Sequence, residues 1–405
     1  MKRLIFTGFI YLIFLFVMFF LSSCEKHTEN KDKIIFWTSS MKPYFTEYIE
    51  GIIKDFEQIY NVDIEWQDYP LDSIYQKILA NFGTDLAPDV VNVNPQLVSG
   101  LYKQKMIVDI SVYDSEIEKL FFRNLIAGCK IHGKLVAIPW YSSTKMLVFN
   151  KKIFDFSKEK IDDYRDFLEI LKKIKQEKGV YGFYPFLKFE QDMLGLGLIK
   201  DPKDPFNDKV IEFFSDLRNY REYLPSGFLV SSVDVAYSMY KDGKVASILI
   251  GPQFLYRIKR ENPALYADTS VVLFFFKNYP VTLMSLSVVN NRSIDRINNS
   301  IKFIRFLTSF KNQNELFKIV PVMPSVEGNY SFEDQDKLME MVKKKMIEIF
   351  PKSSVFDLYF YDVISDPVVR TNIFKNFIND VFNTSYSMEY IQNHYRRKWI
   401  ESIEK

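Results

Sequence analysis

The feature that most constrains the fold is a regular alternation of strand and helix patterns over residues 34–93. Short runs of β-forming residues lie at 34–37, 62–66 and 89–93. Between them, residues 45–56 and 71–82 repeat apolar side chains at the three- and four-residue spacing of one helix face. Strands that alternate with helices of this length predict an α/β fold, with a parallel sheet covered by helices.

This alternation also indicates where a ligand would bind. In open α/β sheets, ligands bind beyond the carboxyl ends of the strands. Those ends correspond to residues 38–40 after the first strand and 94–96 after the third.

The remainder of the chain continues with mixed strands and helices. A glycine turn at 132–134 predicts a hairpin, and further strands are predicted at 146–149, 245–250, 271–275 and 284–289. Helices are predicted over 164–174, 210–217 and 294–310, and the pattern from 332 onward is almost purely helical. About 380 residues follow the N-terminal segment, which is too long for one ordinary core and suits two lobes.

The N-terminal segment indicates export. Lys2 and Arg3 precede an apolar run that ends in Leu21-Ser22-Ser23-Cys24. These residues resemble a bacterial lipobox, which implies a signal peptide over 1–23 and a diacylglycerol and a palmitate on Cys24. Residues 24–33 then form a solvated tether. A retained transmembrane anchor is the alternative, and either version places the rest of the chain outside the cytoplasm at a membrane.

Charge and cysteine content exclude some classes of protein. The chain has 53 Lys and Arg against 51 Asp and Glu, and removing Lys2 and Arg3 leaves 51 of each. A balanced chain carries no electrostatic footprint for nucleic acid. After lipidation Cys129 is the one remaining cysteine, so no internal disulfide can form. Its apolar neighbours favour a buried, unreactive side chain.

Signals for catalysis, metals or cofactors are weak. None of the three histidines lies at metal-ligand spacing from another, and no glycine-rich phosphate loop occurs. Residues 142–145 match the S-x-x-K motif of penicillin-recognising enzymes, but the accompanying motifs are missing. With 51 acids, a glycosidase pair can be neither identified nor excluded. We therefore expect no catalytic residue, no metal and no cofactor.

A positive signal comes from six motifs that occur in order. They are IIFWTSSMKP (34–43), LAPDVVNVNP (86–95), HGKLVAIPWY (132–141), LVFNKKIF (147–154), DGKVASILIGPQ (242–253) and KIVPVMPS (318–325). Together with the lipobox, they resemble the family 1 extracellular solute-binding proteins, the sugar receptors of ABC importers. The resemblance covers essentially the whole mature chain.

The resemblance implies a two-lobed periplasmic-binding-protein-like clamp. Each lobe would be a mixed sheet flanked by helices, with the ligand cleft between them. Lobe 1 is expected to comprise 34–142 and 278–330, and lobe 2 143–277 and 331–405. A sugar would be captured by hinge closure and delivered to the permease subunits by a monomeric, membrane-anchored receptor.

Ten residues are candidate ligand contacts by their position in this pattern. They are Trp37, Thr38, Ser39, Asp85, Asn94, Trp140, Tyr141, Ser142, Gln253 and Tyr279. Structural roles remain open for several. Trp37 and Trp140 could belong to the core, Asp85 could cap a turn before a proline, and Gln253 could be a solvated helix residue.

One departure from the family affects the ligand assignment. Residues 277–282 replace a glycine-rich stretch with KNYPVT, which suggests a reshaped pocket wall that Tyr279 enters. The alternatives are therefore a receptor for a polyol, sugar phosphate or peptide, a sensor-kinase ligand subunit, or a secreted glycan-active lipoprotein enzyme.

Overall fold

The computed structural model describes residues 33–403 except 44, 72, 186–191, 195, 227–231, 274–279, 291, 331–332, 350–353, 356–362 and 365. The predicted signal peptide, the predicted lipidation site Cys24, the predicted tether up to residue 32 and the candidate contact Tyr279 lie outside the described residues.

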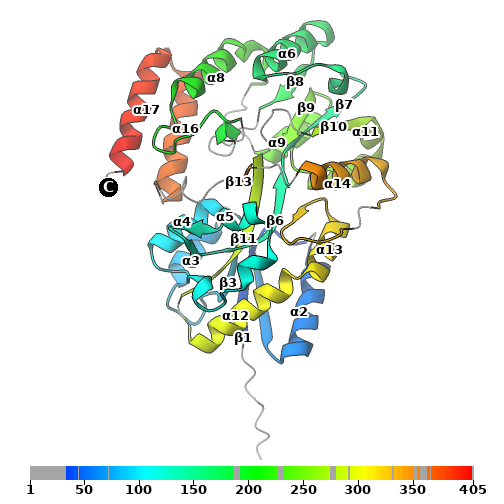
Figure 1. The fold of residues 1–405 in the computed structure, drawn as a ribbon. Coiled ribbons are helices and arrows are strands. Elements are labelled where there is room, and N and C mark those ends of the chain that lie inside the picture. The colour runs from blue at the N-terminus through cyan, green and yellow to red at the C-terminus, as the bar shows by residue number, and fades with distance from the viewer. Residues whose placement is uncertain are drawn as a thin grey trace, which may run out of the picture.

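The chain forms two lobes, each built on its own sheet (Figure 1). The large sheet has the strand order β12-β6-β11-β3-β1-β2, and β13 pairs with β11. Its strands are β1 (Lys33–Ser39), β2 (Asp63–Tyr69), β3 (Val90–Val93), β6 (Ile138–Thr144), β11 (Pro280–Val288), β12 (Met323–Pro324) and β13 (Ser354–Val355).

The predicted parallel pairing over the first hundred residues is confirmed. β1 is parallel to β2, with Ser39 opposite Tyr69, and parallel to β3 on its other side. β11 is antiparallel to both β3 and β6 and lies between them. The carboxyl ends of β1, β2 and β3 therefore share one edge of the large sheet.

Helices cover the large sheet because their apolar stripes need burial. Phe56 of the first helix is fully buried, and its ring lies 5.1 Å from that of Phe303. The main helices of this lobe are α2 (Thr46–Tyr60), α3 (Ile74–Asn81), α4 (Pro95–Lys103), α12 (Ile294–Leu307) and α13 (Phe310–Ile319). The predicted hairpin is also present, as β4 (Lys130–Ile131) and β5 (Lys134–Leu135).

The small sheet has the strand order β10-β7-β9-β8, in which β8 and β9 are parallel. Its strands are β7 (Met146–Asn150), β8 (Tyr181–Tyr184), β9 (Val245–Ile250) and β10 (Thr269–Leu273). Helix α6 (Tyr164–Lys178) begins with a capping box at Asp163 and ends at Gly179, as its sequence predicts. The other helices of this lobe include α8 (Asp208–Asn219), α9 (Val233–Lys241), α10 (Gln253–Glu261) and α11 (Pro263–Asp268).

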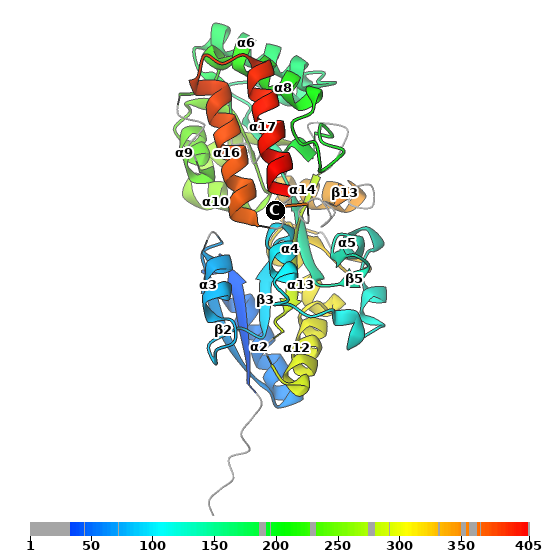
Figure 2. The same ribbon diagram turned by 90° about the vertical axis from the view of Figure 1, so that its left-hand side faces the viewer.

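The C-terminal helices α16 (Pro367–Asn383) and α17 (Met388–Ile403) pack together against α8 (Figure 2). Phe206 lies at the centre of this packing, with rings from both helices around it. Figure 2 shows the two helices running along the small-sheet lobe, with α16 reaching down to α4.

The backbone passes between the sheets more than once. β6 in the large sheet ends at Thr144 and β7 in the small sheet begins at Met146, so Lys145 is the single link. The chain returns between β10 and β11, and after β12 it continues into α14 (Lys337–Ile349), which packs on β10. Two details differ from the expected ranges. Residues 143 and 144 stay in the large sheet, and β13 brings part of 331–405 back to it.

Candidate functional site

The candidate site lies where the parallel strands of the large sheet end. The backbone N–H of Ser40 donates to the carbonyl of Tyr69 across 2.9 Å, joining the chain after β1 to the end of β2. The Ser39 hydroxyl lies 3.4 Å from the side-chain oxygen of Asn92 in β3. Three strand ends are thus held together, as the alternation of strands and helices predicts.

Asp68, near the end of β2, organises the turn that follows β1. Its carboxylate accepts hydrogen bonds from the Thr38 hydroxyl at 2.6 Å and from the backbone N–H groups of Met41 and Lys42 at 3.0 Å each. Thr38 accepts in turn from the indole N–H of Trp66 at 2.8 Å. These bonds fix the turn even though Ser40 has a φ of 56°.

Two aromatic rings form the outer part of this edge. Trp66 and Tyr69 are both half-buried, and the ammonium groups of Lys42 and Lys77 lie 4.4 Å and 4.6 Å from their respective ring centroids. Trp37 is only 2 % exposed and packs beneath Tyr69, with ring centroids 4.8 Å apart. Trp37 therefore supports the outer ring from below.

Strand β6 contributes Tyr141 to the same edge. Its hydroxyl lies 3.8 Å from the sulfur of Met41, in the turn that Asp68 holds. Burial, reinforced by the negative charge of Asp68, raises the pKa of the Tyr141 phenol, so the group stays protonated and can donate a hydrogen bond. Ser142 is fully buried, and its hydroxyl has no hydrogen-bond partner among the described residues.

The structure places Trp140 in the core. Its side chain is fully buried, and it packs edge-on against Phe36 at 6.3 Å and Tyr141 at 5.2 Å. Its carbonyl accepts from the side-chain amide of Gln313 at 2.6 Å. Trp140 belongs to the core because it packs on Phe36 of β1, whose ring in turn lies 5.2 Å from that of Phe303 in α12.

Three other predicted contact residues lie apart from one another in the fold. Asp85 is exposed and precedes β3, so it lies at the opposite edge from the candidate site; its carbonyl accepts from Arg292. Asn94 follows β3 and caps α4, accepting from the N–H of Leu97 at 3.2 Å. Gln253 is exposed at the start of α10, in the small-sheet lobe.

Two contacts connect the lobes near this edge. The link residue Lys145 forms an ion pair with Asp192 at 2.6 Å, and both side chains are largely buried. Arg370 of α16 is 1 % exposed and donates to the carbonyl of Gln96 in α4 at 2.8 Å. The first contact lies at a crossing of the backbone, and the second joins the C-terminal helices to the helix that Asn94 caps.

Sequence reasoning missed Asp68, Tyr69, Trp66 and Arg370. Asp68 and Tyr69 could have been predicted, because ligands bind beyond the carboxyl ends of parallel strands and this applies to the second strand as much as to the first and third. The predicted strand stopped at residue 66, three residues before the end of β2. No local pattern distinguishes Arg370 from the other cations of a helical C-terminal region.

The chemistry of this edge is that of binding. It combines aromatic faces, hydroxyl groups and a carboxylate, a set that contacts both the apolar faces and the hydroxyls of a polar solute. Lys145 is paired with Asp192, which does not favour its use as a base for Ser142. Burial raises the pKa of the Cys129 thiol, which opposes a nucleophilic role. Among the described residues, no group of three His, Cys, Asp or Glu side chains could hold a metal ion.

No helix in the described part of the chain is both long and apolar enough to cross a bilayer. No curated protein matches the chain by sequence.

Solved structures share the fold along almost the whole chain. A protein from Synechococcus sp. MITs9220 assigned as an oligosaccharide periplasmic-binding protein has 18% identity and a TM-score of 0.76, covering 92% of this chain and 99% of its own. The GacH receptor of Streptomyces glaucescens GLA.O, solved with acarbose, has 16% identity and a TM-score of 0.73, covering 93% and 99%. The sugar-binding protein MalE from Xanthomonas citri has 17% identity and a TM-score of 0.73, covering 92% and 97%.

These structures are two-lobed binding proteins, and the expected clamp architecture is thereby confirmed. The family model for the bacterial extracellular solute-binding proteins matches residues 51–340, which include most strands of both sheets and the edge that holds Asp68 and Tyr141. The chain therefore belongs to the bacterial extracellular solute-binding protein family.

Proposed function

We propose that this protein is the substrate-binding receptor of an ABC importer and that its ligand is a sugar or oligosaccharide. The observation that carries the proposal is the edge formed by Thr38, Trp66, Asp68, Tyr69 and Tyr141. Aromatic faces cover the apolar C–H face of a sugar ring, while hydroxyl and carboxylate groups bond its hydroxyls. The sugar-binding proteins with the same fold support this choice of ligand.

We further propose that the ligand is captured by closure of the two lobes, and the backbone crossings between the sheets support this. A ligand favours a closed state only by contacting both lobes, since equal affinity for open and closed states shifts nothing. The large-sheet lobe supplies the edge described above. Gln253, at the start of α10, is our candidate from the small-sheet lobe. We propose the division into 34–142 with 278–330 and 143–277 with 331–405, adjusted so that the first crossing falls at Lys145.

Several further parts of the proposal come from the sequence. Cys24 would carry the lipid that holds the receptor at the outer face of a membrane, and the permease subunits would accept the ligand. The protein would act as a monomer and would make and break no bonds. Tyr279 and Ser142 remain candidate ligand contacts.

A binding screen with matched variants tests the proposal. A thermal-shift screen of the protein against sugars, polyols, sugar phosphates and peptides identifies the ligand class, because a ligand at 100 times its dissociation constant stabilises a fold by about 2.7 kcal/mol. We expect Asp68→Asn to abolish the shift produced by a sugar. Asp85→Asn is the matched control, since it removes the same charge from the opposite edge of the sheet.

The outcome distinguishes the alternatives. A response to sugars that Asp68→Asn removes and Asp85→Asn retains supports the proposed site. A response to phosphates or peptides alone contradicts the sugar assignment and leaves a receptor for another solute. Turnover of a glycan by the purified chain contradicts the receptor role itself.

A further inference from the structure

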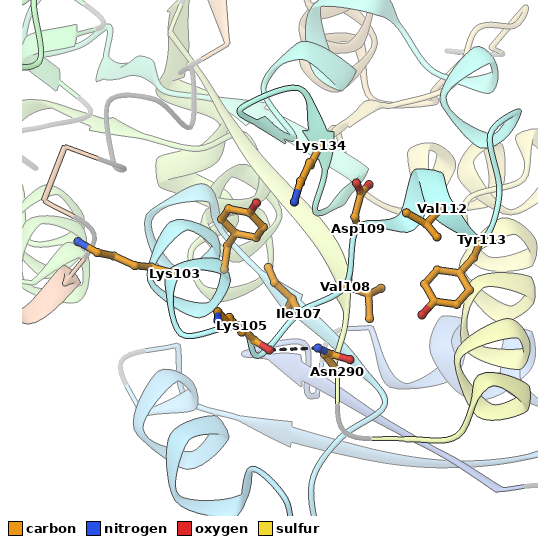
Figure 3. A pocket seen from close by; sticks show the side chains of 10 residues that line it. Lys103, Lys105, Ile107, Val108, Asp109, Val112, Tyr113, Lys134 and Asn290 are labelled. Carbon is orange, nitrogen blue, oxygen red and sulfur yellow. Dashed lines mark hydrogen bonds between the residues drawn. The ribbon is translucent and has the colours of Figure 1, made fainter.

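A second concave surface lies on the large-sheet lobe, away from the strand ends. It is an open cavity of about 500 Å³ at the carboxyl end of α4 (Figure 3). Helix α4 starts beside Asn94 and ends at Lys103, so about 13 Å of helix separates this cavity from the candidate sugar site. Its lining comes from α4, the segment 105–113, the β4–β5 hairpin and the end of β11.

The charge around this cavity is positive. Lys103, Lys105 and Lys134 line it, all three are exposed, and none forms an ion pair with a carboxylate in the part of the chain that the structure describes. Asp109, the one acid in the lining, already accepts from the N–H groups of Ser111 and Leu135 at 3.2 Å each. Asp109 therefore bonds to backbone N–H groups and not to a lysine, and three lysines against one carboxylate leave the lining with a net charge of +2.

Nearby lysines behave differently. Lys119 pairs with Glu116 at 2.5 Å, and Lys130 pairs with Glu118 at 2.5 Å. Lys103, Lys105 and Lys134 differ from these two lysines in that no carboxylate pairs with them in the described part of the chain.

Apolar groups lie beside these charges. Ile107 and Val108 form a buried floor, and Val112 and Tyr113 are 75 % and 38 % exposed at the rim. Exposed aliphatic and aromatic side chains next to unpaired cations suit an occupant that carries both acidic and apolar groups.

The arrangement of the lysines indicates an elongated occupant. Figure 3 shows the Lys134 ammonium extending into the cavity from the hairpin, while the Lys103 ammonium points away from it on the other side. Cations that converge on one point suit a single small anion, whereas cations spread along a groove suit carboxylates spaced along a chain.

We propose that this groove is a docking site for an extended acidic segment of a partner protein. In it, carboxylates of the segment pair with Lys105 and Lys134, a further carboxylate beyond the cavity reaches Lys103, and an apolar side chain covers Val112 and Tyr113. All of the lining belongs to one lobe, so docking does not require a sugar and does not depend on the proposed function.

Fluorescence anisotropy with the full chain and a labelled peptide of alternating glutamate and leucine tests the proposal. We expect the double variant Lys105→Gln/Lys134→Gln to bind about tenfold more weakly, because each lost ion pair weakens binding several-fold. The matched control Lys119→Gln/Lys130→Gln removes the same charge outside the groove and should bind within about twofold of the unmodified protein. Val112→Ser should weaken binding without changing its salt dependence.

Each other outcome overturns the proposal. Equal losses in the two double variants would mean general attraction to a basic lobe. Equal binding of a peptide of glutamate alone would remove the role of the apolar rim. Displacement by inorganic phosphate at constant ionic strength would indicate a small-anion site, and binding to phosphatidylglycerol vesicles with the same sensitivity to Lys105 and Lys134 would indicate a membrane contact.

Discussion

Replacing Trp140 by alanine tests whether this residue belongs to the core of the large sheet or to the proposed ligand site. The indole is fully buried between Phe36 and Tyr141. Truncating a buried tryptophan costs about 3–5 kcal/mol, of which the edge-on ring contacts account for about 1 kcal/mol each. The bond from Gln313 goes to the Trp140 carbonyl and survives the change. We therefore expect the free energy of unfolding of this lobe to fall by about 4 kcal/mol.

Urea unfolding followed by circular dichroism measures this loss. A decrease of about 4 kcal/mol corresponds to a midpoint shift of at least about 1 M for a slope near 3 kcal/mol/M. Trp66→Ala is the matched control, because it makes the same chemical change at a half-buried ring whose one described hydrogen bond goes to Thr38. We expect it to cost about 1–2 kcal/mol in stability and to weaken sugar binding.

The two variants should thus show opposite profiles. Trp140→Ala loses stability and binds ligand below its unfolding transition, whereas Trp66→Ala folds well and binds poorly. If Trp140→Ala unfolded at the same urea concentration as the unmodified protein and lost ligand binding, Trp140 would be a ligand platform and its assignment to the core would be refuted.

Three other perturbations test the packing of the lobes. Asp89→Asn should lower the free energy of unfolding, measured in urea, by about 3–5 kcal/mol. Asp89 is 1 % exposed and lies 3.2 Å from the Nε of Arg292, so the change leaves Arg292 without this counter-charge. A loss under 1 kcal/mol would contradict this reasoning. The hydrogen bond from Arg305 lowers the pKa of Asp114 below its ordinary value of 3.8, so this pair stabilises the fold above about pH 4 and the stabilisation is lost as the pH falls further. Asp114→Asn should therefore be less stable than the unmodified protein at pH 6, and the difference should shrink on titration to pH 3. Arg370→Met removes the hydrogen bond from Arg370 in α16 to the carbonyl of Gln96 in α4. We expect this change to increase the radius of gyration measured by small-angle scattering. An unchanged scattering profile would assign Arg370 to packing within its own lobe.

Much of the architecture could be predicted because it depends on local patterns. The apolar stripe over 45–56 marks α2, and the acids at 162–163 with Gly179 mark the ends of α6. Periodicity and capping operate within a few residues, so a single sequence contains the necessary information.

The candidate site was less predictable because it depends on which strands become neighbours. Trp140 and Tyr141 are adjacent in sequence, yet one packs in the core and the other reaches Met41, a hundred residues away. Whether a tryptophan in an apolar segment is buried depends on which distant elements pack on its side of the sheet, and Trp140 meets Phe36 of β1, whose ring is covered by Phe303 from the second half of the chain. Asp68 is similarly defined by its bonds to the turn after β1.

The position of β11 has a consequence for how the protein reaches its native state. β11 lies between β3 and β6, and the Asn92 side chain bonds to the carbonyl of Ser285, 193 residues further on. A nascent chain that ends before residue 280 leaves both neighbours with unsatisfied edges, so the first lobe begun during synthesis is among the last to be completed. Pairings over such separations slow folding, because loop closure must precede any stabilising contact. Late completion therefore leaves this lobe incompletely folded until most of the chain has been synthesised.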